Sequence, residues 1–186
     1  MNPDEFKKKY LNASSRSTAS KIRKWSKEIC ETMYVLFHAN PSFARCVYLA
    51  YYGPDTSPDI RDFAEDMAIH SERTYFPVIT GNTLSFFEQG TKVEFEKNKA
   101  GIYEPIDITD PLPDDENVII FIPYEIFAGN LGPDIAECYK NFILSYPNVE
   151  GIYGIAFDSQ IGAEPDTDKM LIVPESIITE NRIIHL

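Results

Sequence analysis

The chain has 186 residues, of which 44% are hydrophobic, and it carries a formal net charge of −12 at pH 7. That length and composition support one domain, residues 1–186, built around one core. The negative charge argues against a nucleic acid or an anionic membrane surface as a partner, because both would be repelled. Since no apolar stretch is long enough to span a membrane and the N-terminus lacks the apolar centre of a signal peptide, we expect a cytoplasmic protein.

Helical and strand patterns alternate along the first half of the chain. A basic segment near the N-terminus predicts a short helix, and apolar residues at intervals of three and four predict two amphipathic helices after it. A Gly81-Asn82 pair between two β-prone runs predicts a hairpin. The predicted helices are residues 4–11, 17–39 and 60–70, and the predicted strands are residues 45–52 and 74–79.

The second half begins with a connection over residues 89–117 and continues with buried strands. The apolar run 118–122 is typical of a strand buried on both faces of a parallel sheet, and residues 134–144 show helical spacing. Strands separated by helices imply βαβ crossovers, so the fold class is α/β with a mainly parallel central sheet covered on both faces. The remaining predicted strands are residues 151–157, 171–173, 177–179 and 183–185.

The junction between the strand 118–122 and the helix 134–144 is the first candidate site. In α/β proteins ligands bind at the carboxyl ends of the strands, and the N-terminus of the following helix suits an anion. A loop that binds phosphate usually supplies glycines and cations, but Pro133, Asp134 and Glu137 stand here. The sequence therefore predicts a ligand site whose loop chemistry is unusual for a phosphate.

The cysteines and histidines do not form a metal-binding pattern. Cys30, Cys46 and Cys138 are far apart and odd in number, so we expect buried, reduced thiols. The histidines stand in separate segments without a paired ligand motif, for which surface or capping roles are expected. They are His38, His70 and His185.

Short motifs in a fixed order along almost the whole chain resemble those of the 5-formyltetrahydrofolate cyclo-ligase family, also called methenyltetrahydrofolate synthetases. Each motif is weak alone, whereas their joint order and spacing are specific. The motifs are RKWSKEIC, YLAYY, FPVI, Leu84-Ser85-Phe86, Gly101-Ile-Tyr-Glu-Pro105, Ile120-Phe-Ile-Pro123, Gly154-Ile-Ala-Phe157 with Gln160, Ile178-Thr-Glu180 and Arg182-Ile-Ile184.

This resemblance implies a cyclo-ligase-like, three-layer α/β/α sandwich. In the family, ATP and magnesium activate the formyl oxygen of 5-formyltetrahydrofolate, and attack by N10 closes the ring to 5,10-methenyltetrahydrofolate. The expected cofactors are therefore ATP and Mg, and the expected partners are a small-molecule folate and a nucleotide. We expect a monomer or a weak dimer.

The resemblance also assigns residues to two binding regions, while catalytic residues and metal ligands stay unassigned. The family's glycine-rich loop matches residues 129–140, and a nucleotide-contacting lysine of the family lies near the N-terminus. The expected nucleotide-binding residues are Lys7, Lys8, Gly129, Asn130, Gly132 and Lys140. The expected folate-binding residues are Asp55, Leu84, Phe86, Glu104 and Tyr139.

The loop 129–140 departs from the family pattern. The family's arginine before Leu131-Gly132 has no counterpart, and the family's metal-binding aspartate falls on Lys140. Two hypotheses therefore stay open besides the enzyme. One is a catalytically degenerate family member that acts as a folate-binding or regulatory protein. The other is an α/β protein that binds a nucleotide or a sugar phosphate and shares only the fold.

Overall fold

The computed structural model describes residues 16–38, 40–53, 56–70, 73–88, 94–99, 102–106 and 110–186. At its centre is a seven-stranded sheet whose five inner strands run parallel and whose two edge strands run antiparallel to their neighbours. In spatial order the strands are β3 (Thr83–Glu88), β2 (Thr74–Thr80), β1 (Cys46–Leu49), β6 (Asn117–Pro123), β7 (Val149–Ile155), β8 (Ser176–Ile178) and β9 (Ile183–His185).

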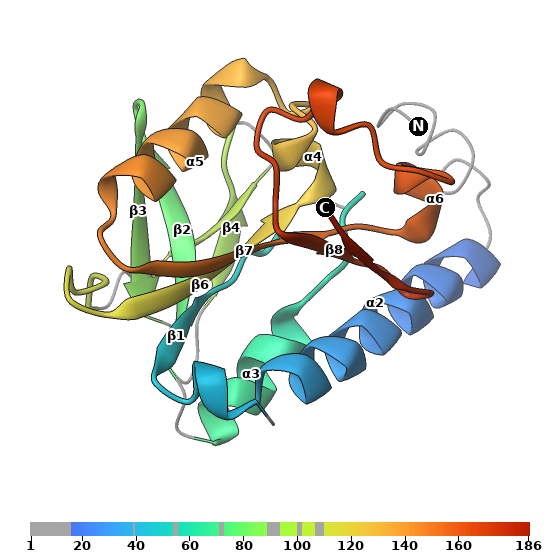
Figure 1. Ribbon diagram of the computed structural model, residues 1–186, viewed down its shortest axis with the longest axis horizontal. Coiled ribbons are helices and arrows are strands. Elements are labelled where there is room, and N and C mark those ends of the chain that lie inside the picture. The colour runs from blue at the N-terminus through green and yellow to red at the C-terminus, as the bar shows by residue number, and fades with distance from the viewer. Residues whose placement is uncertain are drawn as a thin grey trace.

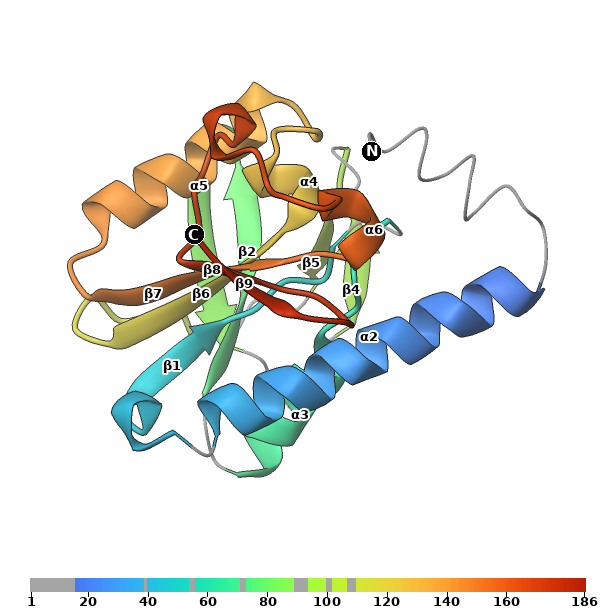
Figure 2. The same cartoon turned by 45° about the vertical axis from the view of Figure 1, so that its right-hand side comes forward.

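Helices cover both faces of this sheet (Figures 1 and 2). One face carries α2 (Arg16–Phe37) and α3 (Arg61–Ile69), and the other carries α5 (Pro133–Ser145) with the short helix α4 (Tyr124–Phe127). The predicted α/β class and the three-layer α/β/α arrangement with a mainly parallel sheet are therefore confirmed. A further short helix, α6 (Asp158–Ile161), follows β7.

The two layers of helices bury two separate apolar clusters. Ile29, Met33 and Phe37 lie one helical turn apart on α2 and are at most 1% exposed, which is the stripe that the sequence predicts for this helix. On the opposite face, Cys138 and Tyr139 of α5 pack into a cluster with the inner strands. The β6 strand contributes to both clusters, because alternate side chains of a strand point to opposite faces of the sheet.

Local signals in the sequence explain where the main elements end. After α2, Pro41 begins a short 3₁₀ helix (Pro41–Phe43), and the side chain of Asn40 caps it by accepting a hydrogen bond from Ser42 N. Between β2 and β3, Gly81 has φ 62° and forms the two-residue turn with Asn82. The predicted amphipathic helix and the predicted hairpin are both confirmed.

One prediction about the connections is incomplete and another is wrong. The sequence predicts mostly connection over residues 89–117, and the described part of this range also contains a small antiparallel sheet of β4 (Phe95–Lys97) and β5 (Tyr103–Pro105). Residues 171–173 were expected to form a strand. Instead, the N–H groups of Leu171 and Ile172 both donate to Phe127 O, at 2.8 and 3.3 Å, so this segment lies against the end of α4.

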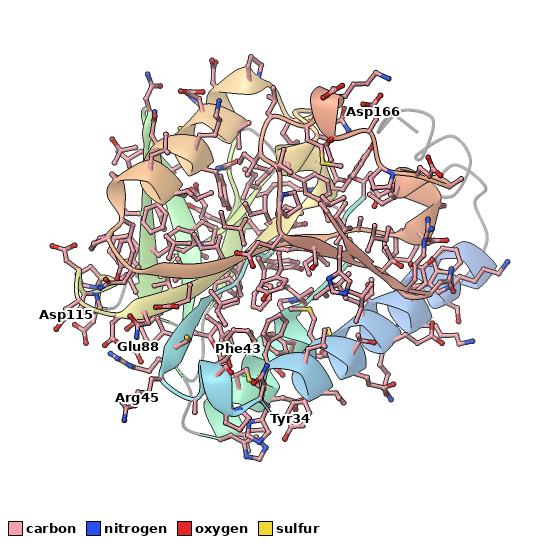
Figure 3. The ribbon with its side chains drawn as sticks, in the orientation of Figure 1. Tyr34, Phe43, Arg45, Glu88, Asp115 and Asp166 are labelled. Carbon is pink, nitrogen blue, oxygen red and sulfur yellow. The ribbon has the colours of Figure 1, made fainter. Side chains whose placement is uncertain are left out.

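The cysteines behave as expected, and two of the histidines lie closer together than their sequence positions suggest. Cys30, Cys46 and Cys138 are free and buried. The rings of His38 and His70, at the C-terminal ends of α2 and α3, lie 4.4 Å apart. Tyr34 lies beside them, at the end of the molecule opposite Asp166 (Figure 3). His185 Nδ1 lies 2.8 Å from Ser176 Oγ.

Some expectations fall outside the described part of the chain. The helix expected over residues 4–11, Lys7, Lys8 and Asp55 all belong to the residues that the structure does not describe. Within the described ranges, no helix combines the length and the apolar character needed to cross a membrane.

Candidate functional site

The candidate site lies at the carboxyl edge of the central sheet. The strands β1, β6 and β7 are parallel neighbours, so their carboxyl ends meet at the same edge. The segments that follow them are residues 50–60, residues 124–132 and residues 156–170. Loops at this edge are the usual place for ligands in a parallel α/β sheet.

A buried carboxyl stands at the centre of this edge. Pro123 ends β6 in an extended conformation and is the N-cap of α4, which turns the side chain of Glu125 into the protein. Glu125 is only 1% exposed. Ser57 donates a short hydrogen bond to Glu125 Oε2, and Gln160 Nε2 donates to Glu125 Oε1 at 3.1 Å. The carboxyl therefore joins the loop after β1 to the helix after β7.

The orientation of the Gln160 amide is fixed by its other partners. Its Oε1 accepts a hydrogen bond from Phe157 N at 2.8 Å, and its Nε2 also donates to Thr56 O at 3.1 Å. With the oxygen engaged by a backbone donor, the amide nitrogen has to face Glu125. Gln160 is therefore a donor to the carboxyl.

The β8–β9 turn holds α6, and with it Gln160, in place. Glu180 Oε2 accepts a hydrogen bond from Asp158 N at 2.9 Å, at the start of α6. Arg182 Nε donates to Asp158 Oδ1 at 2.6 Å, and Arg182 Nη1 donates to Ala163 O at 3.1 Å. These contacts connect both ends of the helix to the edge of the sheet.

Burial dominates the electrostatics of Glu125. Removal from water raises the pKa of Glu125, while hydrogen bonds from Ser57, Thr56 and Gln160 partly oppose the change because they favour the charged form. Burial also raises the pKa of Tyr51, and the nearby Glu125 raises it further. Among the described residues, no lysine or arginine forms an ion pair with Glu125.

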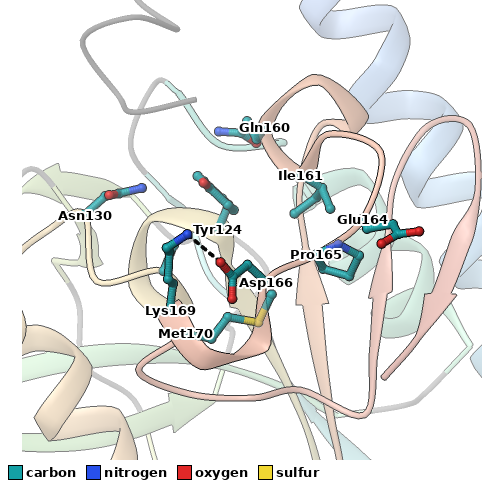
Figure 4. A pocket seen from close by; sticks show the side chains of 10 residues that line it. Tyr124, Asn130, Gln160, Ile161, Glu164, Pro165, Asp166, Lys169 and Met170 are labelled. Atoms are coloured by element: carbon teal, nitrogen blue, oxygen red, sulfur yellow. Dashed lines mark hydrogen bonds and ion pairs between the residues drawn. The ribbon is translucent and has the colours of Figure 1, made fainter.

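One cavity, which we call the edge pocket, lies between α4 and the loop after α6 (Figure 4). It has a volume of about 270 Å³. Lys169 Nζ lies in it, 2.5 Å from Asp166 Oδ2, and this hydrogen bond lowers the pKa of Asp166. Its lining residues are Tyr124, Ala128, Asn130, Gln160, Ile161, Glu164, Pro165, Asp166, Lys169 and Met170.

A second cavity, which we call the helix pocket, lies between α2 and the loop after β1. It has a volume of about 610 Å³. The Arg61 guanidinium lies 3.8 Å from the centre of the Tyr52 ring and forms an ion pair with Asp59 at 2.7 Å. Its lining residues are Ile22, Arg23, Ser26, Lys27, Tyr52, Gly53, Ser57, Pro58, Asp59, Arg61 and Asp62.

Glu125 connects the linings of the two cavities. Ser57 lines the helix pocket and Gln160 lines the edge pocket. Both side chains hydrogen-bond to the same carboxyl. A chain of hydrogen-bonded side chains therefore runs from the lining of one cavity to the lining of the other.

Those expected nucleotide-binding residues that the structure describes lie in two regions, the loop 129–132 and the helix α5. Asn130 lines the edge pocket. Gly129 and Gly132 belong to the same loop and have φ of 73° and 101°, values that favour glycine. Lys140 lies on α5, where it pairs with Glu137 at 3.8 Å.

Asp134 and Glu137 of the same helix line neither pocket. Together with Asn82, they line a separate cavity of about 100 Å³ on the β3 side of α5. Their carboxylates are therefore not among the groups that would face a ligand in the edge pocket.

Four of the five expected folate-binding residues lie near one another between β3, β5 and α5. Leu84, Phe86 and Tyr139 are buried in one cluster, where the Phe86 and Tyr139 rings are 6.3 Å apart. Glu104 Oε1 accepts hydrogen bonds from Ile79 N and from an Asn98 side chain, both at 2.8 Å. The Tyr139 hydroxyl is buried and has no hydrogen-bond partner among the described residues. These residues line neither the edge pocket nor the helix pocket.

Glu125, Ser57 and Lys169 were not among the expected site residues, and Gln160 was noted only as part of a motif. A signal for Glu125 is present in the sequence PYEIFAG, where one carboxylate follows a buried strand and stands among apolar residues. A charged residue in that context is unusual, because burial of a charge is costly without partners. The sequence does not reveal those partners, since Ser57 and Gln160 are 68 and 35 residues away.

The sheet order and the location of the site define a three-layer α/β/α protein with its candidate site at the carboxyl edge of a mainly parallel sheet. No family model and no curated protein matches the sequence. Solved structures do match, and two of them are 5,10-methenyltetrahydrofolate synthetases. The fold of this chain is therefore the one found in those proteins, as the sequence motifs predicted.

Both similarities extend over nearly the whole chain. The 5,10-methenyltetrahydrofolate synthetase of Aquifex aeolicus gives a TM-score of 0.67 at 20% identity, over 98% of this chain and 92% of that chain. The 5,10-methenyltetrahydrofolate synthetase of Mycoplasma pneumoniae gives a TM-score of 0.60 at 15% identity, over 97% of this chain and 99% of that chain.

Proposed function

We propose that the protein is a 5-formyltetrahydrofolate cyclo-ligase that uses ATP and magnesium. The γ-phosphoryl group of ATP is transferred to the formyl oxygen, and ADP leaves. N10 then attacks the activated carbon and loses its proton, and the oxygen departs with the phosphoryl group as phosphate. The products are 5,10-methenyltetrahydrofolate, ADP and phosphate. The fold shared with two 5,10-methenyltetrahydrofolate synthetases supports this choice of reaction.

The connection between the linings of two cavities through one carboxyl is the observation that carries the proposal. A transfer from ATP to a folate requires two ligands that are held side by side with their reacting atoms in contact. Ser57 and Gln160 line different cavities and share Glu125. Ligands in the two cavities would therefore meet at this point of the carboxyl edge.

The edge pocket suits the nucleotide when magnesium accompanies it. Two carboxylates, Glu164 and Asp166, and one ammonium group, Lys169, line this cavity. Free triphosphate fits poorly here because the carboxylates repel it, whereas Mg²⁺ is usually held by one or two carboxylates together with substrate phosphates. Glu164 and Asp166 would hold the metal, and Lys169 with Asn130 would bind phosphate oxygens. When bound, the metal neutralises charge that develops on the transferred group.

The helix pocket suits the folate. Arg23, Lys27 and Arg61 line it and offer donors for the carboxylates of the folate glutamate. The Tyr52 ring provides an aromatic face at which the pterin could replace Arg61. The cavity volume of about 610 Å³ lies within the range of small-molecule sites.

A second candidate is a folate-binding or regulatory protein that has lost the ATP chemistry. The loop 129–140 favours this second candidate, because it lacks the arginine that the family places before the residues matching Leu131 and Gly132. In addition, the ion pair with Asp166 already engages Lys169 in the edge pocket. This protein would bind 5-formyltetrahydrofolate but would not convert it.

A turnover assay separates the two candidates. The protein is incubated with 5-formyltetrahydrofolate, ATP and magnesium, and the methenyl product is followed by its absorbance while ADP is measured in parallel. The cyclo-ligase forms one ADP for each methenyl product, and omission of ATP or of magnesium abolishes both. Binding of 5-formyltetrahydrofolate without any product would support the second candidate and contradict the first.

A further inference from the structure

The chain of side chains that connects the two cavity linings contains a carboxyl whose side-chain hydrogen-bond partners are donors. Ser57, Thr56 and Gln160 donate hydrogen bonds to Glu125, and within the described ranges no lysine or arginine pairs with it. Glu125 is 1% exposed, so water does not screen it effectively. A positive charge that forms beside Ser57 or Gln160 would interact with a carboxylate that has hydrogen-bond donors but, among the described residues, no cation as a partner.

The two folates of the proposed reaction differ in charge at their reacting centre. The formyl group of 5-formyltetrahydrofolate is an uncharged amide. The bridging carbon of 5,10-methenyltetrahydrofolate is part of a cation whose charge is shared by N5 and N10. Ring closure therefore creates a positive charge at the point where ligands in the two cavities would meet.

We propose, on the basis of the cyclo-ligase function proposed above, that Glu125 is a positioning residue that acts through Ser57 and Gln160 and favours the cationic, ring-closed folate over the uncharged formyl folate. The negative charge of Glu125 favours ring closure, because it attracts the cationic, ring-closed folate more strongly than the uncharged formyl folate. Ser57 and Gln160, which line the two cavities, each hydrogen-bond to one oxygen of this carboxyl.

The protonation behaviour of Glu125 agrees with this role. Burial raises the pKa of Glu125 because it disfavours the charged form. A cation nearby favours the ionised form, and its binding therefore releases a proton. The titratable groups that face Glu125 among the described residues are the phenols of Tyr51 and Tyr124, and burial raises the pKa of both. Neither phenol ionises in mildly acidic solution, so the released proton belongs to the carboxyl.

The first test compares the affinities of the two folates by titration calorimetry in mildly acidic buffer, with the unmodified protein and with Glu125→Gln. The substitution keeps the shape and removes the charge. We expect it to weaken binding of 5,10-methenyltetrahydrofolate about tenfold and binding of 5-formyltetrahydrofolate less than twofold. The matched control is Glu137→Gln on the exposed face of α5, which should change neither affinity. Equal weakening of both folates, or the same selective loss in the control, would overturn the proposal.

A second measurement needs only the unmodified protein and keeps the test valid if Glu125→Gln does not fold. Calorimetric titrations in two buffers with different heats of ionisation report proton release. Binding of 5,10-methenyltetrahydrofolate should release a fraction of a proton, and binding of 5-formyltetrahydrofolate should release none. Equal proton release with both ligands would contradict the role of Glu125 and leave the cyclo-ligase function intact. If the unmodified protein binds neither folate, the proposed function and this inference both fail.

Discussion

Glu125 stands in an apolar sequence context that ordinarily predicts a core position, yet it carries a carboxyl. The carboxyl is tolerated because three donors from two segments converge on it, and one of them, Gln160, is oriented by a backbone N–H. The proposed site follows the strand 118–122, where the sequence also predicts a ligand site. Its centre was not predicted, because the partners of Glu125 come from distant segments and only the fold brings them together.

The raised pKa of Glu125 predicts a pH-dependent effect of Glu125→Gln on stability. The ordinary value is 4.5, and burial raises the pKa in the folded state. Above pH 4.5 the unfolded chain loses this proton first, so rising pH favours unfolding of the unmodified protein until the folded state also ionises. The free energy of unfolding of Glu125→Gln should therefore improve relative to the unmodified protein as pH rises. Urea unfolding on both sides of pH 4.5 measures this difference, and a difference that does not vary with pH would contradict it.

Ile29 tests the predicted apolar stripe of α2. Its side chain is 0% exposed, so Ile29→Ala should lower the free energy of unfolding by about 2–5 kcal/mol through lost burial and a cavity. Val35 lies on the same helix and is 67% exposed, so Val35→Ala should stay within about 0.5 kcal/mol. Urea denaturation of both variants provides the comparison, and a loss below about 0.5 kcal/mol for Ile29→Ala would show that the buried face is assigned wrongly.

At the scale of elements, hydrophobic periodicity located the long elements well. The helix predicted over 17–39 is α2 (Arg16–Phe37), and the strand predicted over 118–122 is β6 (Asn117–Pro123). Both have long, strong patterns. The segments β4 and β5 have only three residues each, too few for an alternating pattern to stand out. Residues 171–173 have an apolar, β-prone composition, but tertiary hydrogen bonds to Phe127 decide their conformation.

Two lysines are alternative candidates for nucleotide binding, one in the loop after α6 and one on α5. Lys169 lines the edge pocket, and Lys140 pairs with Glu137 on α5. Lys169→Ala should weaken binding of magnesium-ATP about tenfold, because a charge-assisted contact to phosphate is lost. Lys140→Ala is the matched comparison and should change the affinity less than twofold. Titration calorimetry measures both constants. A larger effect of Lys140→Ala would place the nucleotide beside α5, as the family resemblance alone suggests.

At the scale of the whole molecule, the sheet topology brings segments far apart in the sequence to one edge. The segments 50–53 with 56–60, 124–132 and 156–170 each follow a parallel strand, and the order β1-β6-β7 makes them neighbours. The sequence predicted the class of fold, and it places its candidate ligand site at the same edge of the sheet as the proposed one. It could not predict the cavities, because their shapes depend on side chains from several of these segments.

A ligand that binds only the folded protein should stabilise the whole domain. At about 100 times its dissociation constant, 5-formyltetrahydrofolate should add about 2.7 kcal/mol to the free energy of unfolding. For a domain of this size that corresponds to a rise in Tm of roughly 5–10 °C. Thermal unfolding followed by circular dichroism measures the shift, with free glutamate as a control that should have no effect. No shift at a millimolar concentration of the folate would argue against both folate hypotheses.

The central claim is that two ligands meet at Glu125 on the carboxyl edge of the sheet. The most direct measurement is a crystal structure of the protein with 5-formyltetrahydrofolate, magnesium and a non-hydrolysable ATP analogue. We expect the folate in the helix pocket beside Ser57 and the triphosphate in the edge pocket beside Lys169, with the formyl oxygen and the γ-phosphate in contact near Gln160. A folate bound between β3 and α5 against Tyr139, or a nucleotide bound away from the edge pocket, would contradict this account.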